Sequence, residues 1–324
     1  MNAVDAAYYI GNNQILIFES SSRETILDLT TGALTTLINP TYEYIGTVSG
    51  SSTIQVPNGD IYVIGGDPNA TDSNYIPLFS SITFIAKFDH LTQTWSKVAN
   101  LVTGRAYTSL VLLSGDRIGI YGGRNYNAST YKTTPLSSVE VFNYDTNTVT
   151  QSVDLVGSRF GAAVVPLQTG YTLVAGGVST DNLPLVSQLV HNVDLNFSGS
   201  TNDMTMPRTN ANAISLSNGL VLVSGGYTGV DNTGGTNTAE IFDPQAALYI
   251  EYQSETMPLN STMQFSAKDA SGNPVNVTWS VDNTSIATID SNGLLTSIEP
   301  GIVQVTATSS STITASARIN ILNQ

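Results

Sequence analysis

Four Gly-Gly pairs, each closing a short apolar run, divide most of this 324-residue chain into similar units. Successive pairs are 57, 54 and 49 residues apart. A period of this length with strand-like runs inside it is typical of a radial array of small antiparallel sheets, so the sequence predicts an all-β fold. Residues that leave a strand near a crowded axis need a positive φ or a close backbone approach, which glycine allows. The repeat glycines are Gly65, Gly66, Gly122, Gly123, Gly176, Gly177, Gly225 and Gly226.

Each unit also contains a strand that ends at an aspartate, where a turn is expected to begin. An aspartate in this position accepts a hydrogen bond from the backbone N–H two residues later. The five aspartates are Asp28, Asp89, Asp145, Asp194 and Asp243. Five turns against four Gly-Gly pairs predict a degraded first unit, in which QILIFESS forms the inner strand with Phe18 and Glu19 in place of the glycines.

This pattern resembles the Kelch-repeat β-propeller over about residues 1–245. In that family the glycines end the second strand of a blade, a Glu lies in the third strand, and a Trp follows the turn. Glu140 and Glu240 match the Glu, and Trp95 matches the Trp, whereas the other units lack the Trp. The resemblance implies a five-bladed Kelch-like β-propeller over residues 1–246.

A second pattern begins near Leu248. Alternation in VTWSV, IATID and IVQVTAT, with SNG and EPG turns between them, predicts a small β-sandwich. The order of Trp279-Ser280, residues 286–290, Gly293 and Gly301 is similar to that of the bacterial Ig-like group 2 domain. The resemblance implies such a domain over residues 247–324, a spacer or adhesive module of bacterial surface proteins and phage particles.

Charge and composition exclude several classes of partner. The formal net charge is −14, with 11 Lys and Arg against 25 Asp and Glu. Nucleic acid and anionic lipid both need clustered basic residues, so neither is expected as a partner. There is no cysteine, which excludes disulfides, zinc-thiolate sites and thiol nucleophiles. No apolar run is long enough to cross a bilayer, so no membrane insertion is expected.

Three arginines recur at a fixed offset. Arg105, Arg159 and Arg208 each lie 17 residues before the first glycine of a Gly-Gly pair. Equal offsets in a rotationally repeated fold predict that the three arginines lie on one face, arranged around a central channel. A partial ring of guanidinium groups suits carboxylates or phosphates, which makes these arginines candidate ligand-binding residues. The alternative is that each arginine bridges neighbouring blades by pairing with Glu140, Glu240 or turn carbonyls.

The segments after the Gly-Gly pairs are rich in Asn, Thr and Tyr, and loops on rigid scaffolds commonly carry binding. Tyrosines among small polar residues suit stacking and hydrogen bonding with sugars. The candidate tyrosines are Tyr75, Tyr126, Tyr131 and Tyr227. The alternative is that these segments are ordinary solvated connections. Oxygen-bearing side chains after Gly66 lack the calcium-loop pattern, so we expect no metal and no cofactor.

Catalytic chemistry has little support in the sequence. His90 and His191 are the only histidines and occupy non-equivalent positions in their units. His90 follows a turn aspartate and is expected to be exposed. Neither histidine adjoins a G-x-S-x-G nucleophile motif. We therefore expect no enzymatic activity, with a sugar-processing Kelch enzyme such as a mutarotase as the lesser alternative.

The first eighteen residues contain neither the basic nor the apolar segment of a secretion signal. Together with the two resemblances, this favours a bacteriophage virion surface protein: a head fibre, a capsid decoration protein or a tail-associated fibre. Its expected partners are other virion subunits and a host surface glycan, with self-association through sheet edges left open. The alternative is a bacterial cell-surface adhesin or carbohydrate-binding protein.

Overall fold

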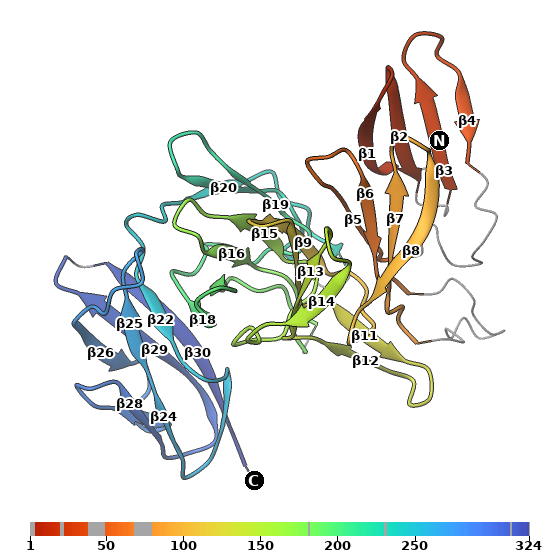
Figure 1. Cartoon of the computed structure of the whole chain (residues 1–324). Coiled ribbons are helices and arrows are strands. Elements are labelled where there is room, and N and C mark those ends of the chain that lie inside the picture. The colour runs from red at the N-terminus through yellow and green to blue at the C-terminus, as the bar shows by residue number, and fades with distance from the viewer. Residues whose placement is uncertain are drawn as a thin grey trace. The chain divides into compact units, whose positions relative to one another are not determined.

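The computed structural model describes residues 4–19, 23–37, 49–67, 80–180, 182–229, 232–311 and 313–323. Its elements are β-strands, and these described residues form no α-helix (Figure 1). The chain divides into two compact units, Met1–Gln151 and Ser152–Gln324. The expected all-β fold is confirmed.

The first unit contains three four-stranded antiparallel sheets, the first three repeats. Repeat one is formed by β1 (Val4–Gly11), β2 (Gln14–Glu19), β3 (Arg23–Asp28) and β4 (Leu34–Thr36). Repeat two is formed by β5 (Ser52–Gln55), β6 (Ile61–Ile64), β7 (Phe84–Asp89) and β8 (Thr94–Asn100). Repeat three is formed by β9 (Ser109–Leu113), β10 (Arg117–Tyr121), β13 (Val139–Asn143) and β14 (Thr148–Gln151). The predicted degraded first unit is therefore present, with β2 on the QILIFE run.

The second unit contains two more repeats and a C-terminal sandwich. Repeat four is formed by β15 (Ala163–Pro166), β16 (Thr172–Ala175), β17 (Gln188–Asn192) and β18 (Phe197–Ser200). Repeat five has three strands, β19 (Asn212–Ser215), β20 (Val221–Ser224) and β21 (Ala239–Phe242). Where a fourth strand would follow, the chain instead enters β22 (Tyr249–Glu251), which pairs with β18. β22 also pairs with β25 (Ser266–Lys268), so the sheet of repeat four has six strands.

The sandwich has two sheets around an apolar core. One sheet is formed by β23 (Thr256–Pro258), β30 (Thr314–Leu322), β29 (Gly301–Ser309) and β26 (Val277–Val281). The other is formed by β24 (Thr262–Gln264), β28 (Leu294–Ser297) and β27 (Ala287–Ile289). In β29 and β30 alternate side chains are buried, Val303 and Val305 among them. This period of two confirms the sandwich predicted from alternation.

Apolar cores join successive repeats within each unit. Phe18 of repeat one lies edge-on to Trp95 of repeat two, with ring centroids 6.2 Å apart. Tyr62 of repeat two packs against Phe142 of repeat three at 5.3 Å. In the second unit, one core cluster includes residues of repeats four and five and Tyr249 of β22. Each sheet is thus covered by its neighbour rather than standing alone, as a stacked repeat requires.

The repeat glycines have the conformation that the sequence predicts. All eight have positive φ, from 56° at Gly122 to 119° at Gly66. A Cβ at Gly65 would collide with the carbonyl oxygen of Arg105, and one at Gly176 would collide with that of Arg208. Both reasons for glycine, the left-handed backbone and the close approach, therefore apply at these positions.

The turn prediction is right at three aspartates and wrong at two. Asp28, Asp89 and Asp243 each accept backbone hydrogen bonds from the residues two and three positions later. In repeat three the acceptor is instead Asn143, which receives hydrogen bonds from the N–H groups of residues 145 and 146. In repeat four it is Asn192. The turn chemistry is the same because an Asn side-chain oxygen accepts as an Asp oxygen does, and the turn begins two residues earlier.

Candidate functional site

Each of the three arginines binds its own repeat through one pattern of hydrogen bonds. Nη1 of Arg105 donates to the carbonyl of Gly122 at 2.8 Å, and Nη1 of Arg159 donates to Gly176 at 3.0 Å. Nη1 of Arg208 donates to the carbonyl of Gly225, also at 2.8 Å. The constant spacing of 17 residues therefore reflects a contact between each guanidinium group and the first glycine of its own pair.

The backbone of these arginines also links neighbouring repeats. The carbonyl of Arg105 accepts the N–H of Gly66 at 2.8 Å, joining repeats two and three. The carbonyl of Arg208 accepts the N–H of Gly177 at 2.8 Å, joining repeats four and five. Arg105 and Arg208 thus bridge successive repeats through their backbone carbonyls, whereas the expected pairing of their side chains with Glu140 and Glu240 occurs within one repeat.

The guanidinium groups form ion pairs with carboxylates and are buried. Arg105 pairs with Glu140, and Arg208 pairs with Glu240 at 3.0 Å. The three arginines are 0–1% exposed. Burial alone would raise the pKa of Glu240, but hydrogen bonds from the Thr205 backbone and from Arg208 lower it below its ordinary value. A ligand would have to displace these partners, so the arginines do not form an open cationic ring in this structure.

The predicted tyrosines have different surroundings. Tyr131 is 68% exposed and Tyr227 is 37% exposed. Tyr126 is buried, so its ring offers no stacking surface here. Tyr126 and Tyr131 do not lie in an irregular loop, because β11 (Arg124–Asn127) and β12 (Lys132–Pro135) form a hairpin that carries them. Tyr75 lies outside the described residues.

A polar and aromatic cluster lies where the Gly-Gly pairs of repeats two and three end. We call Ser49, Asp67, Tyr107 and Arg124 the loop-face cluster. The Arg124 guanidinium stacks on the Tyr107 ring at 4.4 Å and pairs with the Asp67 carboxylate at 3.2 Å. The Tyr107 hydroxyl is hydrogen-bonded to Ser49 Oγ at 3.1 Å. Asp67 and Arg124 directly follow Gly-Gly pairs, so the repeat brings these groups together.

Tyr107 has an unusual backbone conformation for a bulky residue. Its φ is 54°, and the equivalent residues of the other described repeats are Gly50, Gly161 and Asn210, also with positive φ. The Tyr107 N–H donates to the Gly50 carbonyl, as the Asn210 N–H does to that of Gly161. Glycine and asparagine tolerate this left-handed region, whereas tyrosine is strained in it. A Cβ at Gly50 would lie 2.5 Å from the Tyr107 ring, so Gly50 makes room for that ring.

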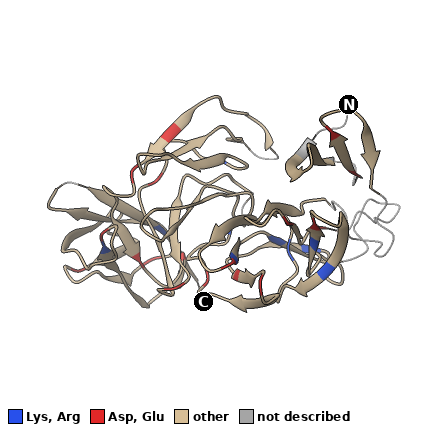
Figure 2. Ribbon diagram, turned by 45° about the horizontal axis from the view of Figure 1, so that its top comes forward, with Lys and Arg blue, Asp and Glu red and all other residues tan. Residues whose placement is uncertain are grey.

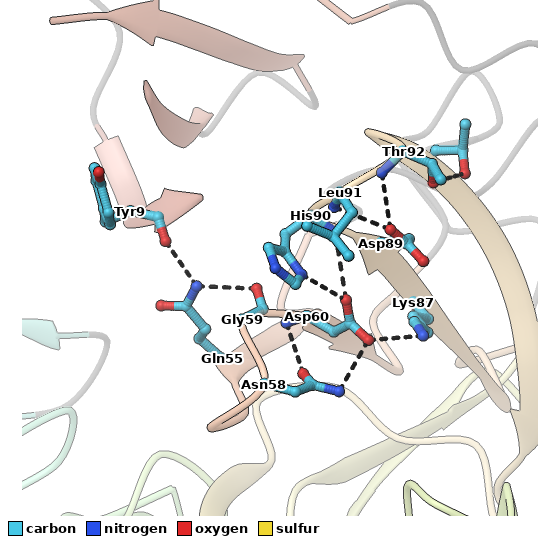
Figure 3. Close-up of polar contacts among 11 residues, drawn as sticks. Tyr9, Gln55, Asn58, Gly59, Asp60, Lys87, Asp89, His90, Leu91 and Thr92 are labelled. Atoms are coloured by element: carbon cyan, nitrogen blue, oxygen red, sulfur yellow. Dashed lines mark hydrogen bonds and ion pairs between the residues drawn. The ribbon is translucent and has the colours of Figure 1, made fainter. Parts of the chain in front are cut away.

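A second titratable cluster surrounds the buried carboxylate of Asp60 (Figure 3). Asp60 accepts from Lys87 Nζ at 2.7 Å and from Asn58 Nδ2 at 3.2 Å, and it is paired with His90 Nδ1 at 2.9 Å. Burial alone would raise the pKa of the Asp60 carboxyl, but the hydrogen bonds from Lys87 and His90 lower it below its ordinary value. Nearby, Gln55 Nε2 donates to the carbonyls of Tyr9 and Gly59, connecting repeats one and two.

The histidines are engaged in the fold. The expectation of an exposed His90 is wrong: its side chain is 20% exposed and rests on Asp60. His191 is fully buried, with Nε2 2.9 Å from the Val153 carbonyl. Burial lowers the pKa of His191, an effect only partly offset by that hydrogen bond and by Asp154. Among the residues that the structure describes, no three His, Asp or Glu side chains gather closely enough to hold a metal ion.

Two important residues were missed at the sequence level. Tyr107 could have been found by aligning the repeats on the arginine, since the second residue after it is Tyr107, Gly161 or Asn210. Glu255, which pairs with Arg159 at 3.5 Å, had no such signal because it lies beyond the repeats. Six of the eleven Lys and Arg residues lie between residues 87 and 132, and Figure 2 marks the basic positions of the described ribbon in blue. No helix in the described part of the chain is long and apolar enough to cross a bilayer.

Comparison with known proteins identifies the family of the C-terminal domain. Residues 248–319 match the family model of the bacterial Ig-like domain (group 2), which confirms that part of the sequence interpretation. Among solved structures, one titled "Structure of YjhT" is similar with a TM-score of 0.46 and 13% identity, covering 76% of this chain and 93% of that chain. No curated protein matches this chain.

Proposed function

We propose that the five repeats form a five-bladed Kelch-like propeller and that the chain is a non-enzymatic surface protein of a bacteriophage virion. In this proposal it is a head fibre, a capsid decoration protein or a tail-associated fibre. It binds a host surface glycan or other virion subunits. The Ig-like domain supports this proposal, because such domains occur in surface and particle proteins.

The observation that carries the binding proposal is the strained Tyr107 in the loop-face cluster. Strained residues persist where the surrounding structure holds them, and they concentrate at functional sites. Here Arg124 covers part of the ring and Ser49 binds the hydroxyl, while Tyr107 remains half-buried rather than buried. An aromatic ring beside a guanidinium group, a carboxylate and a hydroxyl supplies both stacking and directed hydrogen bonds for a saccharide.

The test is binding of the purified full chain to a glycan array and to intact bacterial cells, beside Tyr107→Asn. Asparagine occupies the equivalent position in repeat five and accepts the left-handed backbone. We therefore expect an unchanged or higher melting temperature, because strain of about 1 kcal/mol is relieved. We expect glycan binding to fall at least tenfold, because stacking and the hydroxyl contact are lost.

The matched control is Tyr9→Asn, which removes a 56% exposed tyrosine from β1 in the first repeat. The loop-face assignment would be contradicted if the wild-type chain binds glycan, Tyr107→Asn binds equally well and Tyr9→Asn binds more weakly. If the wild-type chain binds no glycan or cell but binds purified virion subunits, the structural role in the particle remains and the glycan role is rejected. If the protein is found attached to the surface of the bacterium that makes it, the virion proposal is rejected in favour of a bacterial adhesin.

A further inference from the structure

Repeat four has no glutamate at the position that pairs with the arginine in repeats three and five. In repeats three, four and five, the first glycine of the Gly-Gly pair donates its N–H to the carbonyl of the residue just before the third strand, which is Ser138, Ser187 or Thr238. Two residues later, repeats three and five have Glu140 and Glu240, the partners of their arginines. The equivalent residue of repeat four is Leu189.

Glu255 of the Ig-like domain supplies the missing group. Its Oε1 lies 3.5 Å from Nη2 of Arg159, whose side chain is 1% exposed. The Glu255 N–H donates to the carbonyl of Val156 at 3.0 Å, and the Glu255 carbonyl accepts from Asn320 at 2.8 Å. The backbone therefore holds Glu255 between repeat four and β30. Burial raises the pKa of the Glu255 carboxyl, an effect partly offset by Arg159 and Arg318.

Gly157 provides an independent observation of the same exchange. A Cβ at Gly157 would collide with the Glu255 carboxylate. The equivalent residues, two before each arginine, are Thr103 in repeat three and Met206 in repeat five. Repeats with their own glutamate therefore carry a side chain at this position, whereas the repeat that receives Glu255 has a glycine. No positive φ requires a glycine at residue 157.

We infer that the Ig-like domain is an integral part of repeat four, which it completes by inserting Glu255 where the repeat's own third-strand glutamate is missing. The domain is then fixed to the repeat array and does not act as a freely jointed spacer. Other contacts follow the same interface: Ser200 Oγ donates to the Ser316 carbonyl at 2.7 Å, and Thr201 Oγ1 donates to that of Leu248 at 3.0 Å. This inference does not depend on which ligand the loop-face cluster binds.

The first test uses Glu255→Ala in the full chain, followed by hydrogen–deuterium exchange of residues 152–161 and by calorimetry. The Arg159 side chain is buried whereas the Glu255 side chain is 29% exposed, so removing Glu255 leaves a buried charge without its carboxylate partner. We expect the protection of residues 156–159 to fall at least tenfold and the melting temperature of the second unit to fall by roughly 5 °C or more. The control is Glu251→Ala, which removes a 40% exposed carboxylate from the neighbouring β22 and is expected to leave both unchanged.

The second test restores the carboxylate within the repeat. Leu189→Glu combined with Glu255→Ala should regain most of the lost protection, whereas Leu189→Gln in the same background should not. Failure of the glutamate to restore protection would overturn the equivalence of residues 189 and 255.

The third test fills the space next to Gly157 that the Glu255 carboxylate occupies. Gly157→Ala alone should reproduce the loss of Glu255→Ala, and the double variant should lose no more than either single variant, because both remove one contact. The inference would be overturned if the losses of protection in the two single variants add in the double variant. It would also be overturned if either single variant keeps wild-type protection near Arg159.

Discussion

At the scale of single residues, recurrence in the sequence identifies a role without revealing whether that role is structural or functional. The three arginines recur because each binds a glycine of its own repeat, and the pattern was visible in the sequence. Their burial was not visible, because it depends on carboxylates from other strands and, for Arg159, from another domain. Tyr107 is different because it departs from the repeat pattern, in which the equivalent residue is glycine or asparagine. The structure adds that Tyr107 keeps the positive φ of Gly50 and Gly161, and so is strained.

Asp60 belongs to this scale because one carboxylate organises Asn58, Lys87 and His90. Its folded-state pKa lies below the ordinary 3.8, so the folded state binds fewer protons than the unfolded chain. Its stabilising contribution is therefore complete above about pH 4 and is lost as the pH falls through the lowered pKa. We expect Asp60→Asn to lower the free energy of unfolding by about 2 kcal/mol at pH 7, with a smaller difference near pH 3.

Urea unfolding of the wild-type chain and Asp60→Asn at both pH values measures this difference. The control is Asp116→Asn, because Asp116 precedes β10 as Asp60 precedes β6 but is exposed and binds Tyr144 at 3.0 Å. A loss that stays constant between pH 7 and pH 3 would contradict the assignment to an ionised Asp60.

At the scale of elements, the strands and the Gly-Gly corners followed from local chemistry, whereas the exceptions came from tertiary contacts. Apolar runs such as IYVI form fully buried strands, as their position before the glycines indicates. The β11–β12 hairpin was missed because its RNYN and KTTP strands are polar and lack apolar alternation. The exit of the chain from repeat five into β22 was also missed, since no local signal distinguishes a missing fourth strand from a short one.

The Gly-Gly corner predicts a specific cost for substitution. Gly176→Ala places a Cβ in left-handed backbone and against the Arg208 carbonyl, so we expect a loss of about 3 kcal/mol in the free energy of unfolding. Gly170→Ala has the same sign of φ but only an ordinary contact at 3.8 Å, so it should cost about 1 kcal/mol. Chemical denaturation of the two variants gives the comparison, and equal losses would mean that the close approach contributes nothing.

At the scale of the whole molecule, charge sets the classes of partner. The net charge is −14, with 11 Lys and Arg against 25 Asp and Glu, so we expect weak binding to phosphate-rich partners. We expect binding to double-stranded DNA weaker than about 10⁻⁴ M, measured by fluorescence anisotropy at 50 mM salt. Micromolar binding with a steep salt dependence would contradict this expectation.

The extension of repeat four by β22 has a mechanical consequence. A pulling force on the Ig-like domain reaches the covalent link to repeat five, and it also reaches the β18–β22 hydrogen bonds and the Arg159–Glu255 pair of repeat four. The load is therefore divided between two repeats, and strands paired side by side resist it together. Separating the Ig-like domain from the repeats therefore requires breaking these hydrogen bonds and this ion pair, and not only extending a flexible linker.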